Sequence, residues 1–152
     1  MNSKQFKNLY TRELDKLEKE VAAYQTDDEM WIVVPGTINS AGNLVQHLIG
    51  NLRTYIGHAL GDVPYARDRD AEFAKRLFTK ETLLVEITVL QGILDSALSK
   101  LTDNELQQEY PSEVLVMFPE QSVHIILTHL LIHLGYHLGQ INYHRRFAMA
   151  MN

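Results

Sequence analysis

The stretch from Glu120 to Met149 is the feature that most constrains the fold. It contains no proline, and its only glycines are Gly135 and Gly139. Its apolar residues recur at steps of three and four, the spacing of one face of an α-helix. They are Ile126, Leu130, Leu134, Leu138 and Ile141. We therefore expect one long amphipathic helix here, with few interruptions.

Three further segments show the same periodicity, at about residues 3–24, 40–60 and 80–100. Ser3, Ser40 and Thr79 stand at their starts and are suitable helix N-caps. The apolar positions are Phe6, Leu14, Leu17 and Val21, then Leu44, Leu48 and Leu52, then Ile87, Leu94 and Leu98. Four helices of similar length predict an all-α protein, a four-helix bundle formed by a single domain spanning residues 1–152.

The connections between these segments are expected to be mostly irregular. Residues 26–39 contain two aspartates and a Pro-Gly step, and residues 101–119 contain Asp-Asn and Tyr-Pro steps. Each connection also contains a short apolar run, at residues 30–34 and 113–118. The first run could be extended and could pair with the second. Residues 67–70, Arg-Asp-Arg-Asp, are predicted to be a polar connection.

Composition narrows the possible functions. Of 152 residues, 14 are basic and 19 acidic, giving a formal net charge of -5. This field repels phosphate backbones, so we expect no nucleic-acid partner. The chain has no cysteine, which leaves His, Asp or Glu as ligands for any metal. The first residues lack the apolar core of a signal peptide, and no run of about 18 apolar residues is free of charge. We expect a cytoplasmic protein with no membrane partner.

The seven histidines are therefore the residues to explain. His129, His133 and His137 are four apart, so they lie on successive turns, each rotated by roughly 40°. His137 falls at the margin of the apolar arc, His133 beside it, and His129 further towards solvent. A His-x-x-x-His pair can direct two imidazoles to one metal ion, whereas three successive turns diverge.

His47 lies at the margin of the apolar face in the segment 40–60. If this helix packs beside the last one, His47 can face His133 and His137, giving three neutral imidazoles with a coordination position left open. Such open sites usually support chemistry. The alternative is that each histidine is a hydrogen-bonded structural residue. His58, His124 and His144 have no such arrangement and are expected to be exposed or capping.

Two sequence motifs resemble the DinB superfamily, also called the DinB/YfiT-like metalloenzymes. They are NSAGNLVQHL at residues 39–48 and HLGYHLGQI at residues 133–141. Chain length and helix count agree over essentially the whole sequence. Within the superfamily the chain is most similar to an uncharacterised bacterial branch, through GNLR at residues 50–53 and RDRDAEF at residues 67–73.

The resemblance implies an up-down-down-up bundle and one divalent metal ion, nickel or zinc, held by His47, His133 and His137. The superfamily often has His-Arg-Gly-Gln where this chain has Leu138 after His137, so any role of that arginine is absent or taken by another residue. Better-studied relatives transfer low-molecular-weight thiols such as bacillithiol or mycothiol, or act as hydrolases or isomerases with such thiols.

Several polar side chains could support this site. Asn43 and Asn51 lie one turn on either side of His47 and could orient its ring or a bound water molecule. Interhelical hydrogen bonding is the alternative for both, and Asn43 is also a candidate catalytic group. Gln140 could orient His137 in the same way. Tyr136 is a candidate acid or substrate contact, with simple packing as its alternative.

Three arginines are candidates for binding an anionic substrate: Arg53, Arg67 and Arg69. A guanidinium group can bind a carboxylate through two hydrogen bonds. Arginines in an Arg-Asp-Arg-Asp run are otherwise most often solvated and paired locally.

Three functional interpretations remain. The first is a metal-dependent enzyme acting on a small-molecule substrate, as a hydrolase or a thiol S-transferase. The second is a binding module whose metal is structural or absent, with a fourth protein ligand such as His129. The third is a helical dimerisation protein, which requires an exposed apolar patch around Tyr10, Trp31 and Tyr55. A homodimer is compatible with all three, and we favour the first.

Overall fold

The computed structural model describes residues 1–111, 114 and 121–151, and the regular structure within them is helical. The sole exception there is an isolated antiparallel bridge between Glu109 and Ser122. Four long helices make up the bundle: α1 (Ser3–Ala22), α2 (Ala41–Leu52), α5 (Lys80–Lys100) and α6 (Val123–Ala150). The prediction of an all-α four-helix bundle is confirmed.

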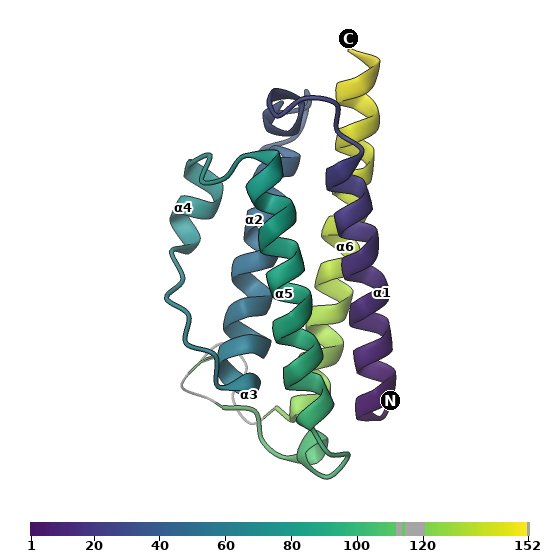
Figure 1. Cartoon of the computed structure of the whole chain (residues 1–152), viewed down its shortest axis with the longest axis vertical. Helices are drawn as coiled ribbons and strands as arrows, with labels where there is room; N and C mark the ends of the chain where they lie inside the picture. The colour runs from purple at the N-terminus through teal and green to yellow at the C-terminus, as the bar shows by residue number, and fades with distance from the viewer. Residues whose placement is uncertain (112–113, 115–120, 152) are drawn as a thin grey trace.

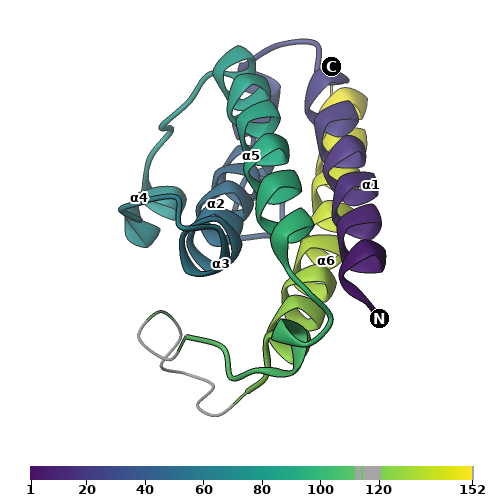
Figure 2. The ribbon, with the colours of Figure 1, turned by 60° about the horizontal axis from the view of Figure 1, so that its bottom comes forward.

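The helices run up, down, down and up in the order α1, α2, α5, α6 (Figure 1). Antiparallel neighbours need only short loops, but α2 and α5 run in the same direction. Their connection therefore returns along the outside of the bundle, where it forms the short helix α4 (Arg69–Ala74). In both views α4 lies on the outer side of α2 (Figure 2).

One cluster of buried side chains fills the space between the four long helices. Its completely or almost completely buried members include Phe6, Leu14, Leu17, Leu48, Leu52, Leu83, Ile87, Leu90, Leu127 and Leu134. Burying each such side chain contributes roughly 1.5–3 kcal/mol of transfer free energy. Tyr10 also lies in this core, where its hydroxyl donates to the carbonyl of Leu127 at 2.7 Å. The apolar stripes read from the sequence thus form the core.

The helix starts agree with the sequence analysis to within a residue for three helices. Ser40 caps α2 and Thr79 caps α5, each accepting a hydrogen bond from the third residue of its helix. The cap of α1 is Asn2 instead of Ser3, because Asn2 and Gln5 form a reciprocal capping box. Ser122 caps α6, about two residues later than expected.

The helical run that begins with α2 continues past Leu52. A π-helical turn, η2 (Arg53–His58), and a last turn, α3 (Ala59–Gly61), carry it to Asp62, whose φ of 55° ends it. The run therefore covers the predicted span of about 20 residues. Its wider turn begins six residues after His47, and π-turns inside helices frequently occur at functional sites.

The connections differ from expectation in three places. The run 30–34 was expected to be extended, but its first two residues lie in the 3-10 helix η1 (Asp28–Trp31), whereas Ile32 is extended. The Glu29 carboxylate accepts hydrogen bonds from the backbone of Gln25 and Thr26 before this turn. The predicted pairing with residues 113–118 lies, apart from Val114, outside the described residues. The segment predicted as a polar connection contains the start of α4, and a 3-10 turn, η3 (Glu105–Gln107), follows α5.

In the part of the chain that the structure describes, α5 alone is long and apolar enough, by length and composition, to cross a membrane. This helix contains Glu81, Glu86 and Asp95, so it is not a run free of charge. The stripe of α5 that contains Leu83, Ile87 and Leu90 belongs to the core cluster. Core helices of soluble proteins commonly have this length and composition.

Candidate metal centre

Three histidines from two helices meet at one point in the bundle. His47 comes from α2, and His133 and His137 come from α6. The Nε2 atoms of His47 and His133 are 3.3 Å apart, and those of His133 and His137 are 3.1 Å apart. All three ligand atoms lie within 4.8 Å of one another. We call these residues the three-histidine cluster.

Hydrogen bonds on the far side of two rings determine which nitrogen faces the cluster. Nδ1 of His47 lies 3.0 Å from Oε2 of Glu72, and Nδ1 of His137 lies 2.6 Å from Oε1 of Gln140. Both oxygens are acceptors, so we assign the proton to each Nδ1. Arg67 Nη2 also lies 3.2 Å from Nδ1 of His47, but its shorter contact is the hydrogen bond that it donates to Glu72 at 2.8 Å. Nε2 of each ring therefore presents a lone pair to the cluster, the arrangement that metal-binding imidazoles require.

The surroundings of His133 fit a metal ion bound between the three histidines. Its Nδ1 is buried without a partner among the described residues, and its Nε2 faces two other lone pairs. A single N–H on Nε2 of His133 cannot donate well to both His47 and His137. A cation between the three Nε2 atoms would interact favourably with all of them. Two ligands about 2.05 Å from a tetrahedral ion lie about 3.3 Å apart. The Nε2 separations of 3.1 and 3.3 Å match that value.

The environment of His133 and His137 favours the neutral imidazole, the form that binds metals. Burial, and then the charge that His137 and His47 would carry, lower the pKa of His133 to about 4. Burial also lowers the pKa of His137, although its hydrogen bond to Gln140 works in the opposite direction. Protons therefore compete weakly with a metal ion for these nitrogens near neutral pH.

Glu72 supports His47 and is the principal site residue that the sequence analysis missed. It lies on α4, its side chain is 4% exposed, and both oxygens bind Arg67, at 2.7 Å from Nε and 2.8 Å from Nη2. Burial acts to raise the pKa of Glu72, but the hydrogen bonds from Arg67 and His47 outweigh it, and the pKa is lowered. The result is a charged carboxylate that orients the His47 ring.

This geometry changes the role expected of Arg67. Arg67 was a candidate for binding an anionic substrate, but its side chain is 11% exposed and pairs with Glu72. The other two arginines are also engaged. Arg53 pairs with Glu86 at 2.7 Å, and exposed Arg69 lies over the ring of Phe73, 5.4 Å from its centroid. Arg67 lies behind the cluster, with Nη2 3.2 Å from Nδ1 of His47, whereas Arg53 and Arg69 have partners elsewhere.

Polar side chains of α2 hold α4 in place. The Asn43 amide donates to the carbonyls of Glu72 and Phe73 at 3.1 and 3.3 Å. The buried Gln46 amide donates to the carbonyl of Glu72 and to that of Lys75. Asn43 therefore makes the interhelical hydrogen bonds of the alternative interpretation and acts on His47 only through the position of Glu72.

The remaining predicted residues are placed as follows. Gln140 contacts His137, with Oε1 2.6 Å from Nδ1. Asn51 is buried, and its Oδ1 has no partner among the described residues, so a contact with His47 is not seen. Tyr136 is 64% exposed, which excludes core packing, and its ring lies edge-on to His137 at 5.2 Å between centroids.

The histidines outside the cluster divide into two groups. His58 and His129 are exposed, and His124 is half-buried beside the N-terminal amine, 3.0 Å away. The expectation for His144 was wrong, because this residue is only 7% exposed. It lies seven residues after His137, which is about two turns, and so belongs to the same face of α6. The sequence interpretation rested on the four-residue spacing of His129, His133 and His137, and His144, seven residues after His137, falls outside that spacing.

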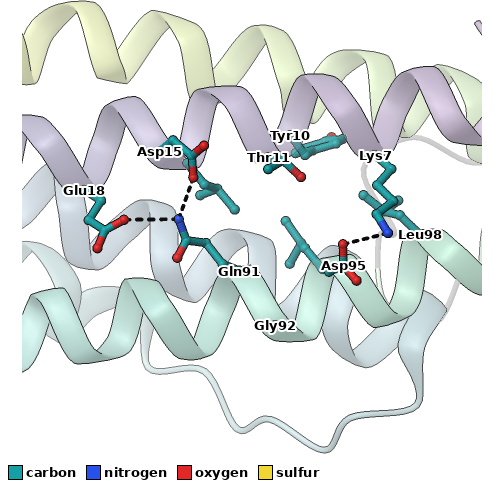
Figure 3. Close-up of a pocket in the computed structure, with 11 residues that line it drawn as sticks. Lys7, Tyr10, Thr11, Asp15, Glu18, Gln91, Gly92, Asp95 and Leu98 are labelled. Atoms are coloured by element: carbon teal, nitrogen blue, oxygen red, sulfur yellow. Dashed lines mark hydrogen bonds and ion pairs between the residues drawn. The ribbon is translucent and has the colours of Figure 1, made fainter.

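Cavities lie on two sides of the bundle. One of about 320 Å³ adjoins the cluster and is lined by Tyr136, His137, Gln140 and His144 together with residues 36–39. Another, of about 420 Å³, lies between α1 and α5 (Figure 3). There Lys7 pairs with Asp95 at 2.7 Å and Gln91 donates to Asp15 at 3.0 Å. Neither α1 nor α5 carries a cluster histidine, so the cavity between these two helices is not part of the site.

Comparison with known proteins places the chain in a family. Residues 3–150 match the family described as "Protein of unknown function (DUF1572)", and the chain belongs to it. The chain is also similar to the crystal structure of a DinB-like protein from Bacillus cereus ATCC 10987, with a TM-score of 0.73 and 20% identity over 97% of this chain and 93% of that chain. A comparison with curated proteins gave no significant match. The fold is thus DinB-like, which confirms the resemblance at the level of the fold.

Proposed function

We propose that this protein is a divalent-metal-dependent enzyme of the DinB type, which uses an open three-histidine site for hydrolysis or for low-molecular-weight thiol transfer. The observation that carries the proposal is the convergence of three Nε2 atoms on one point, with Nδ1 bonds fixing two of the rings. Imidazole ligands suit zinc and nickel, the two metals we propose.

The set of ligands supports a catalytic ion more than a structural one. Structural zinc sites usually have four protein ligands, whereas three histidines leave a position open. Within the described residues, the group close enough to share an ion consists of His47, His133 and His137, without His129. A divalent ion held there would supply Lewis acidity, polarising an electrophile and favouring the deprotonated form of water or of a thiol.

The residues of the chain have distinct tasks in this proposal. Glu72 and Gln140 keep two imidazoles in the correct tautomer, and Arg67 keeps Glu72 charged. Tyr136 lies beside His137 at the mouth of the adjoining cavity, where its hydroxyl can contact a substrate or transfer a proton to it.

A substrate screen tests the proposed activity. Zinc- and nickel-loaded protein would be assayed with esters, amides and epoxides, each with and without a low-molecular-weight thiol. We expect turnover that disappears on chelation and in His137→Ala, and the thiol dependence distinguishes transfer from hydrolysis. Stoichiometric metal binding without turnover of any substrate class would favour the binding module instead.

A homodimer remains part of the proposal. Exposed apolar side chains on one side of α6 would be covered by a second copy, among them Ile125 and Ile132. The dimerisation-only interpretation is weakened because Tyr10, one centre of its required patch, is 1% exposed. Light scattering coupled to size exclusion measures the mass, and a monomer at all concentrations would contradict the dimer.

A further inference from the structure

The cavity beside the three-histidine cluster adjoins a further cavity along α6. The first, of about 320 Å³, begins at His137. The second, of about 370 Å³, lies further towards the C-terminus, between Val34 and Phe147. Both are lined by Thr37, Gln140 and His144, so they share a wall. We call the two together the α6 groove.

His144 is the unexplained polar residue of this groove. It is 7% exposed, and its Nδ1 is enclosed with no hydrogen-bond partner among the described residues. An enclosed N–H without an acceptor is rare in proteins, so we expect the proton on Nε2. Since Nδ1 is enclosed, Nε2 is the nitrogen that His144 can offer to the groove as a donor. Nε2 has no acceptor among the described residues, so a ligand oxygen in the groove can accept its proton.

The lining of the α6 groove carries no fixed charge. None of the described residues that line either cavity is Asp, Glu, Lys or Arg. The cavity further from the cluster is walled mainly by apolar groups, among them Val34, Tyr143 and Phe147. The cavity at His137 adds uncharged polar groups, including Asn39 and Gln140. Burying a charged group against such walls without a partner is unfavourable. The groove therefore suits an uncharged, mainly apolar molecule.

We propose that the α6 groove binds an uncharged organic substrate whose apolar part lies against Tyr143 and Phe147, whose acceptor oxygen receives a hydrogen bond from His144, and whose reactive end lies beside His137. The assignment of this ligand as the substrate rests on the function proposed above. Binding in the groove does not depend on a metal ion.

The chain offers a matched pair of glycines for the test. A Cβ atom built at Gly139 or at Gly135 would meet no atom within 4 Å, so both accept a larger side chain. Gly139 lines the second cavity, whereas Gly135 lines neither. Gly139→Leu would therefore fill the groove, and Gly135→Leu would change the same helix to the same extent without filling it.

The probe is benzamide, which is uncharged, aromatic and carries one carbonyl oxygen. Backbone amide shifts of metal-free, 15N-labelled protein would be followed by NMR during titration. We expect shifts at Thr37, Gly139 and His144, and binding weakened at least 10-fold in Gly139→Leu but unchanged in Gly135→Leu. Equal weakening in both variants, or shifts absent from the groove, would overturn the proposal. If Gly139→Leu fails to fold, Tyr143→Ala, which removes an exposed wall, should weaken binding instead.

Two further comparisons test the chemistry. His144→Phe should weaken benzamide about 2- to 12-fold, the usual value of one neutral hydrogen bond, and leave toluene binding unchanged. Benzoate and benzylamine should bind more weakly than benzamide, and equal or tighter binding of either would overturn the uncharged class. Because no metal is present, failure here leaves the metal proposal intact, and a protein that binds no metal can still bind benzamide.

Discussion

At the scale of single residues, the site is organised by what lies behind each imidazole. His47 is held by Glu72 and His137 by Gln140, whereas the Nδ1 of His133 has no partner among the described residues. Two rings are therefore fixed by hydrogen bonds and the third by its position on α6. Mutation of a residue that orients a metal-binding histidine typically lowers metal affinity by about 10- to 100-fold.

Glu72→Gln tests this support of His47. The amide keeps the size of the side chain but loses the charge that Arg67 and the Nδ1 proton of His47 bind. We expect zinc affinity, measured by competition with a chelator, to fall about 10- to 100-fold. Glu86→Gln is the control, because it removes another Arg–Glu pair, with Arg53, away from the cluster. Equal losses in both variants would show that Glu72 acts through general stability.

His144 provides a prediction about pH. Burial lowers its pKa, so the folded protein binds fewer protons here than the unfolded chain, in which histidine has a pKa of about 6.5. Stability contributed by this group is therefore present above that pKa and is lost as pH falls below it. In metal-free protein, His144→Phe should lose less free energy of unfolding between pH 7.5 and 5.5 than wild type does, as measured by urea denaturation.

The control for this pH experiment is His58→Asn, which removes an exposed histidine outside the core. We expect it to keep the wild-type dependence. If His144→Phe and wild type lose the same free energy over this range, the imidazole of His144 is accessible to protons in the folded state.

At the scale of elements, the site depends on how closely α4 approaches α2. A Cβ atom at Gly50 would collide with the carboxylate of Glu72 and come within 3.2 Å of Arg67 Nε. The Asn43 and Gln46 amides fix the backbone of α4 at this distance. Glycine at position 50 is therefore required by the contact between the helices and not by its own backbone conformation.

Gly50→Ala should consequently destabilise the protein and lower its zinc affinity, since Glu72 must move. In an unobstructed helix, the same change stabilises by about 1 kcal/mol. Gly135→Ala is the matched control, because its Cβ meets nothing within 4 Å, and we expect it to raise the free energy of unfolding. A stabilised Gly50→Ala with full metal affinity would show that α4 does not need this close approach.

The elements also show how far sequence analysis extends. The four long helices were predictable because each repeats its apolar spacing over several turns. Helix α4 was not, because six residues contain too little periodicity and its position depends on amides of α2 that lie about 30 residues earlier. Glu72 was missed for the same reason, because no regular spacing in the sequence relates it to His47. The three cluster histidines were found from helical spacing and the resemblance together, but His144 was not.

At the scale of the whole molecule, the three-histidine cluster joins distant parts of the chain. It links α2 to α6 directly and α4 through Glu72, so residues from 47 to 137 contribute to one site. A ligand that binds only the folded state stabilises it, by about 2.7 kcal/mol when present at 100 times its dissociation constant. Metal binding should therefore stabilise the bundle as a unit.

We expect zinc or nickel to raise the Tm of chelator-treated protein by about 5–10 °C at that excess, given about 2–4 °C per kcal/mol for chains of this size. His47→Ala should abolish this shift. His129→Ala should preserve it, since the cluster of described residues is formed without His129. Differential scanning calorimetry measures all three, and an equal shift in His47→Ala would locate the metal elsewhere.

The metal content of the protein as purified tests the central claim most directly. Elemental analysis would be made on protein prepared without an affinity tag or added metal, for wild type and for His47→Ala, His133→Ala, His137→Ala and His129→Ala. We predict close to one transition-metal ion per chain, lost in the first three variants and retained in His129→Ala. No metal in the wild-type protein, and no uptake of nickel or zinc on titration, would contradict the proposed metal centre.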